Sequence, residues 1–134
     1  MNSRLPSTPI IQVSWAELID KITILEIKER RLRANEAIAK VQYELAMLMN
    51  VVHDILAHRH ELISLKMQLK SVNEELWDIE DKIRAKEAAK SFDQEFIDLA
   101  RSVYVYNDKR SDIKRRINVL LDSELIEVKQ YTPY

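Results

Sequence analysis

Apolar residues recur in alternating steps of three and four through most of this chain. Four such stripes can be followed, and each is separated from the next by a slip in phase. The most regular comprises Leu62, Leu65, Leu69, Val72, Leu76, Ile79 and Ile83. The others are Trp15, Leu18, Ile22, Leu25 and Leu32; Ile38, Val41, Leu45, Leu48, Val52 and Ile55; and Phe96, Leu99, Val103, Tyr106, Arg110, Ile113, Ile117 and Leu120. This spacing places each set on one side of a helix, as the seam of a coiled coil or bundle requires.

The phase slips predict four helices, with breaks near residues 34–35, at 58–60 and at 91–94. The first helix is expected to begin after Ser14, because Ser14 and Glu17 have the spacing of a capping box. In that motif the hydroxyl accepts from the Glu17 amide while the Glu17 carboxylate reaches back. The pattern leaves open whether the first two segments are separate helices or one bent rod.

The fold class follows from the length of these segments. The chain has 134 residues, no glycine, and prolines only at positions 6, 9 and 133, so its interior lacks both strong helix breakers. We expect an all-α protein: an elongated antiparallel helical bundle, or helical hairpin, with coiled-coil-like heptad seams. The predicted parts are an extended arm (1–13), one helical domain (14–123), and a C-terminal tail (124–134) docked on the bundle through its apolar residues.

Charge and composition exclude several classes of function. Twenty-one basic residues stand against 22 acidic ones, so no overall field draws the chain to nucleic acid or a membrane. No apolar run approaches the roughly 18 residues of a membrane span, and no signal-peptide core is visible, so a cytoplasmic location is expected. The absence of cysteine excludes disulfides and thiolate sites, and the absence of glycine excludes phosphate-binding loops.

Acid-before-base pairs at a spacing of four are expected to stabilise single helices. Seven occur: Glu17–Lys21, Glu26–Arg30, Glu29–Arg33, Glu36–Lys40, Asp78–Lys82, Glu80–Arg84 and Asp112–Arg116.

Metal, cofactor and nucleic-acid sites are not favoured. Acid pairs at a spacing of three are about as frequent as chance predicts, and none of the three histidines follows a glutamate by three residues, as helical di-metal sites need. The basic stretch 101–116 contains Tyr104 and Tyr106, but bases near a helix C-terminus also interact favourably with its dipole. We therefore expect no metal and no cofactor, and do not favour a nucleic-acid partner.

One enzyme comparison rests on the first helix. From Asp20 to Arg31 it superficially resembles the first helix of the all-α chorismate mutases. Two cations of that family are missing, because Val13 and Val41 stand where an arginine and a lysine are needed. This interpretation is the least favoured.

A polar stripe beside the apolar seams is the more informative feature. Half-buried charged groups must be paired, so the stripe predicts either a structural network that fixes helix register or a ligand pocket. The pattern favours the network. The candidate ligand-binding residues are Asp20, Glu26, Trp77, Glu80, Arg84, Arg101, Tyr104, Asn107, Asp108 and Arg110.

Arg110 gives the most specific prediction of this set. It occupies a seam step where an aliphatic residue is expected, and its guanidinium cannot lose its charge. It should therefore meet a carboxylate or an anionic ligand. The expected acids are Asp20 or Glu26 on the first helix and Glu80 or Asp81 on the third.

Four stretches carry a family resemblance. They are SWAELIDKITILEIKERR, NEELWDIEDKIRAKE, FIDLARSVYVYNDKRSDIKRRIN and SELIEVKQY. Together they resemble a domain-of-unknown-function family of short bacterial and phage proteins, from about Val13 to Tyr131. The resemblance implies a small helical protein without an established activity, some of whose relatives lie near glycosyltransferase and surface-polysaccharide functions. The matching positions include Glu17, Asp20, Lys21, Thr23, Glu26, Trp77, Glu80, Asp81, Arg84, Arg101, Tyr104, Asn107, Asp108, Arg110 and Lys114.

Two hypotheses for function remain. The favoured one is a non-catalytic binding protein, self-associating as a homodimer, because heptads on every helix exceed what one thin bundle can cover. Its partners would be a second copy, another protein or a small anionic ligand. The alternative is a small all-α enzyme with a carboxylate–arginine pocket that acts on an anionic metabolite or nucleotide sugar.

Overall fold

The computed structural model describes residues 5–134 and contains four α-helices over that range: α1 (Trp15–Arg31), α2 (Asn35–His58), α3 (His60–Ala88) and α4 (Gln94–Leu120). The all-α prediction and the three predicted breaks are confirmed. The bent-rod alternative is wrong, because the backbone leaves the helical region at Leu32 and re-enters it only after Ala34. These residues therefore turn the chain between two separate helices.

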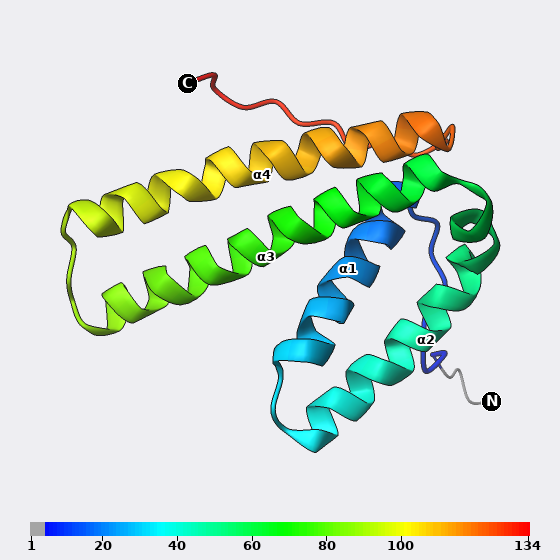
Figure 1. Ribbon diagram of the computed structural model, residues 1–134, viewed down its shortest axis with the longest axis horizontal. Coiled ribbons are helices and arrows are strands. Elements are labelled where there is room, and N and C mark those ends of the chain that lie inside the picture. The colour runs from blue at the N-terminus through cyan, green and yellow to red at the C-terminus, as the bar shows by residue number, and fades with distance from the viewer. Residues whose placement is uncertain (1–4) are drawn as a thin grey trace.

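The helices form two antiparallel hairpins of unequal length (Figure 1). Helices α3 and α4 lie side by side along their length, while the shorter pair, α1 and α2, packs across one end of them. Helix α1 contacts all three of the others. The opposite end of the α3–α4 hairpin projects beyond α1 and α2.

Helix α1 is buried on several sides because of this central position. The buried residues occupy almost every turn: Ala16, Ile19, Asp20, Ile22, Thr23, Leu25 and Ile27. The main apolar core joins α1 to Val52 of α2 and to the covered halves of α3 and α4: Ala16, Ile19, Ile22, Val52, Leu62, Leu65, Leu69, Ile113 and Ile117. Burial of these aliphatic side chains drives the packing of α1 against the hairpin.

Side chains cap the starts of α1 and α4, and the cap of α1 is the predicted one. The Ser14 side chain accepts from the Glu17 amide at 3.1 Å, and the Asp93 carboxylate accepts from the Phe96 amide at 3.0 Å. The Glu17 carboxylate does not complete the capping box but bonds to Lys114 on α4. The α1 start is further fixed from α4, since the Ala16 amide donates to the Asn118 side chain at 2.9 Å.

Two helices end in a left-handed residue although the chain has no glycine. Lys90 follows α3 with φ 53° and Asp122 follows α4 with φ 52°. In each case the next residue donates back to the last turn, Ser91 to Lys86 and Ser123 to Asn118. This is the Schellman arrangement, in which glycine usually occupies the left-handed position. The left-handed backbone conformation costs each of these non-glycine residues about 1 kcal/mol.

Several of the predicted single-helix ion pairs instead join different helices. Glu36–Lys40, Glu80–Arg84 and Asp112–Arg116 are formed. Others are replaced by pairs across helix interfaces: Arg30–Glu74, Arg31–Asp78, Lys21–Glu44, Lys66–Glu26 and Lys114–Glu17. Sequence spacing identifies which groups share a helix face, but the neighbouring helix competes for the same charges.

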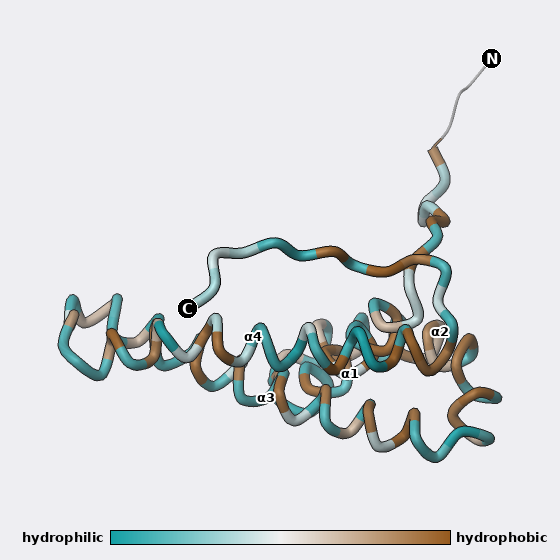
Figure 2. The backbone as a smooth tube through the Cα atoms, turned by 90° about the horizontal axis from the view of Figure 1, so that it is seen from above, coloured by the Kyte–Doolittle hydropathy of each residue, from teal (hydrophilic) through white to brown (hydrophobic). Residues whose placement is uncertain are grey.

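The two ends of the described chain behave differently (Figure 2). Residues 5–13 lead away from the helices, and the tail after α4 runs back over them. Polar contacts hold the tail: Glu127 pairs with Lys114 at 3.3 Å, and the Tyr134 hydroxyl donates to Asp108 at 2.6 Å. Its apolar residues Ile126 and Val128 remain exposed. The division into arm, domain and docked tail stays a prediction.

Candidate functional site

The Asp20 carboxylate lies at the centre of the polar side chains buried between α1, α3 and α4. It is only 3% exposed. One of its oxygens, Oδ1, accepts from the Asn73 amide at 2.9 Å and from Arg110 Nε at 3.1 Å, and the other accepts from Arg110 Nη2. A carboxylate removed from water needs such partners, and a bidentate hydrogen bond from a guanidinium is among the strongest that it can accept.

The neighbours of Asp20 satisfy one another as well. Asn73 also donates to the Thr23 hydroxyl at 2.9 Å, and that hydroxyl donates to the Asp20 backbone carbonyl at 2.7 Å. The bond to Asp20 raises the pKa of Arg110 against the opposing effect of burial. Arg110 is therefore a fixed cation, and Asp20 is the acid that the sequence predicted among four possibilities.

Lys114 extends the polar cluster from the core to the tail. Its ammonium lies 2.6 Å from Glu17, 3.3 Å from Glu127 and 3.9 Å from Asp20. Burial raises the pKa of Glu127, but the charges of Lys114 and Lys129 and their hydrogen bonds outweigh it, so that the pKa is lowered. The cluster thus joins α1, α4 and the tail with every charge opposed by another.

A small cleft opens directly beside this cluster. It has a volume of about 250 Å³ and is lined by Ile24, Ile27, Asn73, Leu76, Trp77, Glu80, Asn107 and Arg110. Ile24, Ile27 and Leu76 supply an apolar wall. Arg110 and Asn107 supply hydrogen-bond donors, and Glu80 supplies the one carboxylate of the lining.

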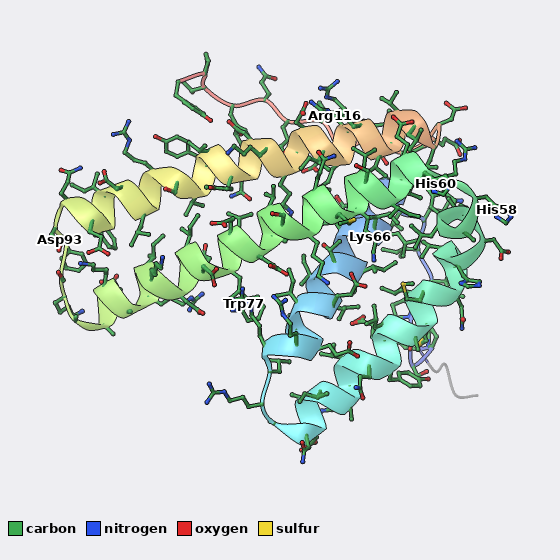
Figure 3. All side chains as sticks on the ribbon, in the orientation of Figure 1. His58, His60, Lys66, Trp77, Asp93 and Arg116 are labelled. Carbon is green, nitrogen blue, oxygen red and sulfur yellow. The ribbon has the colours of Figure 1, made fainter. Side chains whose placement is uncertain are left out.

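Trp77 projects from α3 toward α1 (Figure 3) and lines the cleft together with residues of α1 and α4. The Arg31 guanidinium lies 5.7 Å from the centre of its ring, at a distance suited to a cation–π contact. Arg31 is held there by Asp78 at 2.6 Å, and their hydrogen bond raises the pKa of Arg31 and lowers that of Asp78. The ring is therefore positioned from both helices.

A second, larger cleft lies between α4 and the tail. Its volume is about 1010 Å³, and Tyr104, Asn107 and Asp108 meet residues of the tail in its lining. The Tyr134 hydroxyl donates to Asp108, and this bond raises the pKa of Tyr134. The Tyr134 ring packs edge-on against Tyr104, with centroids 4.8 Å apart. Asn107 lines both clefts.

The remaining candidates lie outside these clefts or at their margin. Arg101 contacts the Tyr104 hydroxyl at 3.5 Å on the exposed side of α4. Arg84 is exposed and meets Glu80 at 3.9 Å. Glu26 lies on another side of α1, where Lys66 binds it at 3.1 Å and Lys70 lies 3.8 Å away. The predicted set is thus divided among several surfaces of the molecule.

Three important residues were outside the predicted site. Asn73 lies four residues before Trp77 on α3, and Thr23 and Lys114 are among the positions that carry the family resemblance, but none was included as a ligand-binding residue. Lys114 could have been found from its position one turn after Arg110, on the same face of α4. The residues of the tail carry no periodic signal that would direct them to α4.

Comparison with known proteins places the chain in a family. A model of a family of unknown function, DUF6165, matches residues 10–134. The chain belongs to the DUF6165 family. The match covers all four helices, both clefts and the tail, so the resemblance recognised in the sequence is confirmed at the level of the family. No curated protein and no solved structure matches the chain.

Membership of the DUF6165 family does not indicate an activity. The arrangement of the described residues limits the kinds of site that the chain can form. Across residues 5–134, no group of three or more histidine, aspartate or glutamate side chains is placed to hold a metal ion. Over the same range, no helix combines the length and apolarity needed to cross a membrane. The small cleft lined by Arg110 (the Arg110 cleft) contains four of the predicted residues, and the cleft between α4 and the tail (the tail cleft) contains three.

Proposed function

We propose that this DUF6165 protein is a non-catalytic binding protein that holds a small anionic molecule in the Arg110 cleft. The observation that carries the proposal is the double role of Arg110. Its Nε and Nη2 atoms bond to buried Asp20, while the same side chain lines the cleft. Asp20 therefore fixes the guanidinium before any ligand arrives, which reduces the entropy lost on binding.

The lining favours a ligand with an apolar body and one acidic group. Ile24, Leu76 and the Trp77 ring offer apolar and aromatic surface, and Arg110 and Asn107 offer donors at the edge. The volume of about 250 Å³ lies below the roughly 300–1,000 Å³ of sites for drug-sized molecules. The ligand class is consequently a small planar or branched carboxylate or phosphate.

A binding role is consistent with acidic groups that serve as ion-pair acceptors. Burial can raise the pKa of a carboxyl group toward neutrality, which suits it to proton transfer. Here three carboxyl groups have pKa values below their ordinary ones: Asp78, Asp93 and Glu127. They are acceptors in ion pairs, and Asp20 is occupied in the same manner by Arg110.

Ligand binding can be tested with benzoate and phenyl phosphate as probes, each compared with neutral benzamide. We expect the anions to raise the melting temperature by several degrees at millimolar concentration, because a ligand that binds only the native state stabilises it. Trp77→Leu and Asn107→Leu should each reduce the shift at least threefold. Lys82→Ala, which removes a cation from the exposed side of α3 outside the cleft, is the control and should leave the shift unchanged.

Two results would overturn the proposal. One is the absence of any shift with both anions. The other is a shift that Tyr134→Ala abolishes and Trp77→Leu leaves intact, because the ligand would then lie in the tail cleft. Self-association would use a different surface, since the Arg110 cleft is built from three helices of a single copy.

A further inference from the structure

Helix α2 has two faces that run along its length. The inner one is the predicted seam from Ile38 to Ile55, and its residues are buried or half-buried. The outer one runs over seven exposed positions: Glu36, Lys40, Tyr43, Met47, Val51, Asp54 and His58. At about 100° per residue, all seven lie within about 40° of the direction of Met47. Among the described residues nothing covers this face: Tyr43 is 73% exposed, Met47 45% and Val51 57%.

The outer face reads the same from either end. Its steps are four, three, four, four, three and four, with Met47 at the centre. Tyr43 and Val51 lie four residues to either side of Met47, and Lys40 and Asp54 lie seven residues to either side. Apolar residues occupy the middle three positions and charges of opposite sign the next two. Such a pattern is its own complement when a second copy is turned end for end.

We propose that two copies of this chain associate through the outer faces of α2, antiparallel, with a two-fold axis at Met47. Lys40 then meets Asp54 of the partner subunit, Tyr43 meets Val51 of the partner subunit, and the two methionines meet each other. Closed dimers of this isologous type use one patch twice. The positions of the outer face repeat every 11 residues rather than every seven, a spacing that keeps the seam aligned with slight right-handed winding of the two helices.

Charge determines both the partner and its orientation. A parallel pair would place Lys40 against Lys40 of the partner subunit and the aspartates against each other, which is unfavourable. The antiparallel pair replaces both repulsions with ion pairs. Neither clash nor pairing involves the Arg110 cleft, because α2 contributes no residue to it.

The interface is small, and this limits its strength. From Glu36 to His58 the seam is about 33 Å long at 1.5 Å per residue. Only Tyr43, Met47 and Val51 supply apolar surface to it, whereas a standard interface buries about 800 Å² on each partner. We therefore expect a reversible dimer with a dissociation constant on the order of 10 µM.

A charge exchange tests the proposal at positions that are fully accessible. Sedimentation velocity from about 1 to 200 µM protein should show the native chain passing from monomer to dimer. Lys40→Glu and Asp54→Lys should each weaken the dimer at least tenfold, because each sets like charges against one another. Combining the two substitutions should restore it. Lys82→Glu, an equal charge change on the exposed side of α3, should have no effect.

Cross-linking provides a second test of the same two-fold axis. The chain has no cysteine, so Met47→Cys introduces a single thiol at the proposed axis. A short bismaleimide should link two copies efficiently at this position and poorly with Gln42→Cys, which lies on the flank of α2. A chain that stays monomeric at 200 µM overturns the proposal. A dimer that survives both single charge changes and links equally through Gln42→Cys also overturns it.

Discussion

The two halves of the α3–α4 hairpin have the same seam spacing but different surroundings. In the covered half, α1 packs against the hairpin, and Leu69, Ile113 and Ile117 are buried. In the projecting half the two helices have only each other, and the seam residues Ile83, Phe96 and Leu99 are only half-buried. A heptad therefore predicts which side chains meet across a helix pair, whereas a third helix decides how completely they leave water.

Polar groups differ between the halves in the same way. The covered half contains Asp20 with Arg110, Asn73 and Lys114, all of them buried or half-buried. Ion pairs of the projecting half are at its surface, as with Lys86, which lies 2.9 Å from both Asp93 and Glu95. Burial makes the first set costly to disturb and water makes the second set easy to replace.

The largest effect is expected from Asp20→Asn. This change leaves the guanidinium of Arg110 without its carboxylate inside the protein, which should lower the free energy of unfolding by about 3 kcal/mol. Asp98→Asn makes the same chemical change on the exposed surface of the projecting half and should alter it by less than about 0.5 kcal/mol. Urea denaturation followed by circular dichroism measures both.

The pair itself can be separated from the loss of one partner. Combining Arg110→Met with Asp20→Asn removes both charges, so the desolvation cost disappears with the attraction. We expect this double variant to recover more than half of the stability lost in Asp20→Asn. If the double variant is as unstable as Asp20→Asn, the stability lost in Asp20→Asn is not due to the unpaired charge of Arg110.

A smaller contrast is expected between two aliphatic truncations of α4. Ile117→Ala empties a fully buried position and should cost about 3 kcal/mol, whereas Leu99→Ala in the projecting half should cost about 1 kcal/mol. Amide hydrogen exchange should show the same order, with the projecting half exchanging first. Equal costs at both sites would contradict the division of the hairpin into two halves.

The smallest effect concerns the turn at the end of the projecting half. The Lys86 ammonium and the Phe96 amide hold the pKa of Asp93 at about 2, below its ordinary 3.8. A lowered pKa stabilises the turn above pH about 3.8, and the stabilisation is lost as the pH falls through about 2. An NMR titration should show the Asp93 midpoint rising toward 3.8 in Lys86→Met. Lys82→Met should leave it in place.

Local features of the fold were predictable from the sequence, and relations between helices were predictable only in part. The Ser14 cap and the breaks between helices depend on a few consecutive residues. Arg110 could be expected to meet an acid, since its charge stands in an apolar seam. The choice of Asp20 over Glu80 depends on how α1 crosses the hairpin, which no periodicity specifies.

The candidate residues show the same limit. Trp77, Glu80, Asn107 and Arg110 line one cleft because α3 and α4 present facing polar steps. Glu26 shares a helix with Asp20 but lies six residues further on, and the rotation over those six residues turns it toward Lys66. The tail cleft could not be predicted, because Tyr134 reaches Asp108 through a segment without regular structure.

The hydrogen bonds at the start of α1 have a consequence for the order in which the molecule is made. The amides of Trp15 and Ala16 are bound by Ser123 and Asn118, more than 100 residues later in the chain. These partners are synthesised long after α1, so the first amides of the helix cannot form these bonds until α4 and the residues after it have been made. The α3–α4 hairpin can close through local contacts as soon as it emerges, and low sequence separation makes such closure fast. Packing of the start of α1 against α4 is therefore a late step of folding. A chain truncated before Asn118 lacks both side chains that bind the first amides of α1.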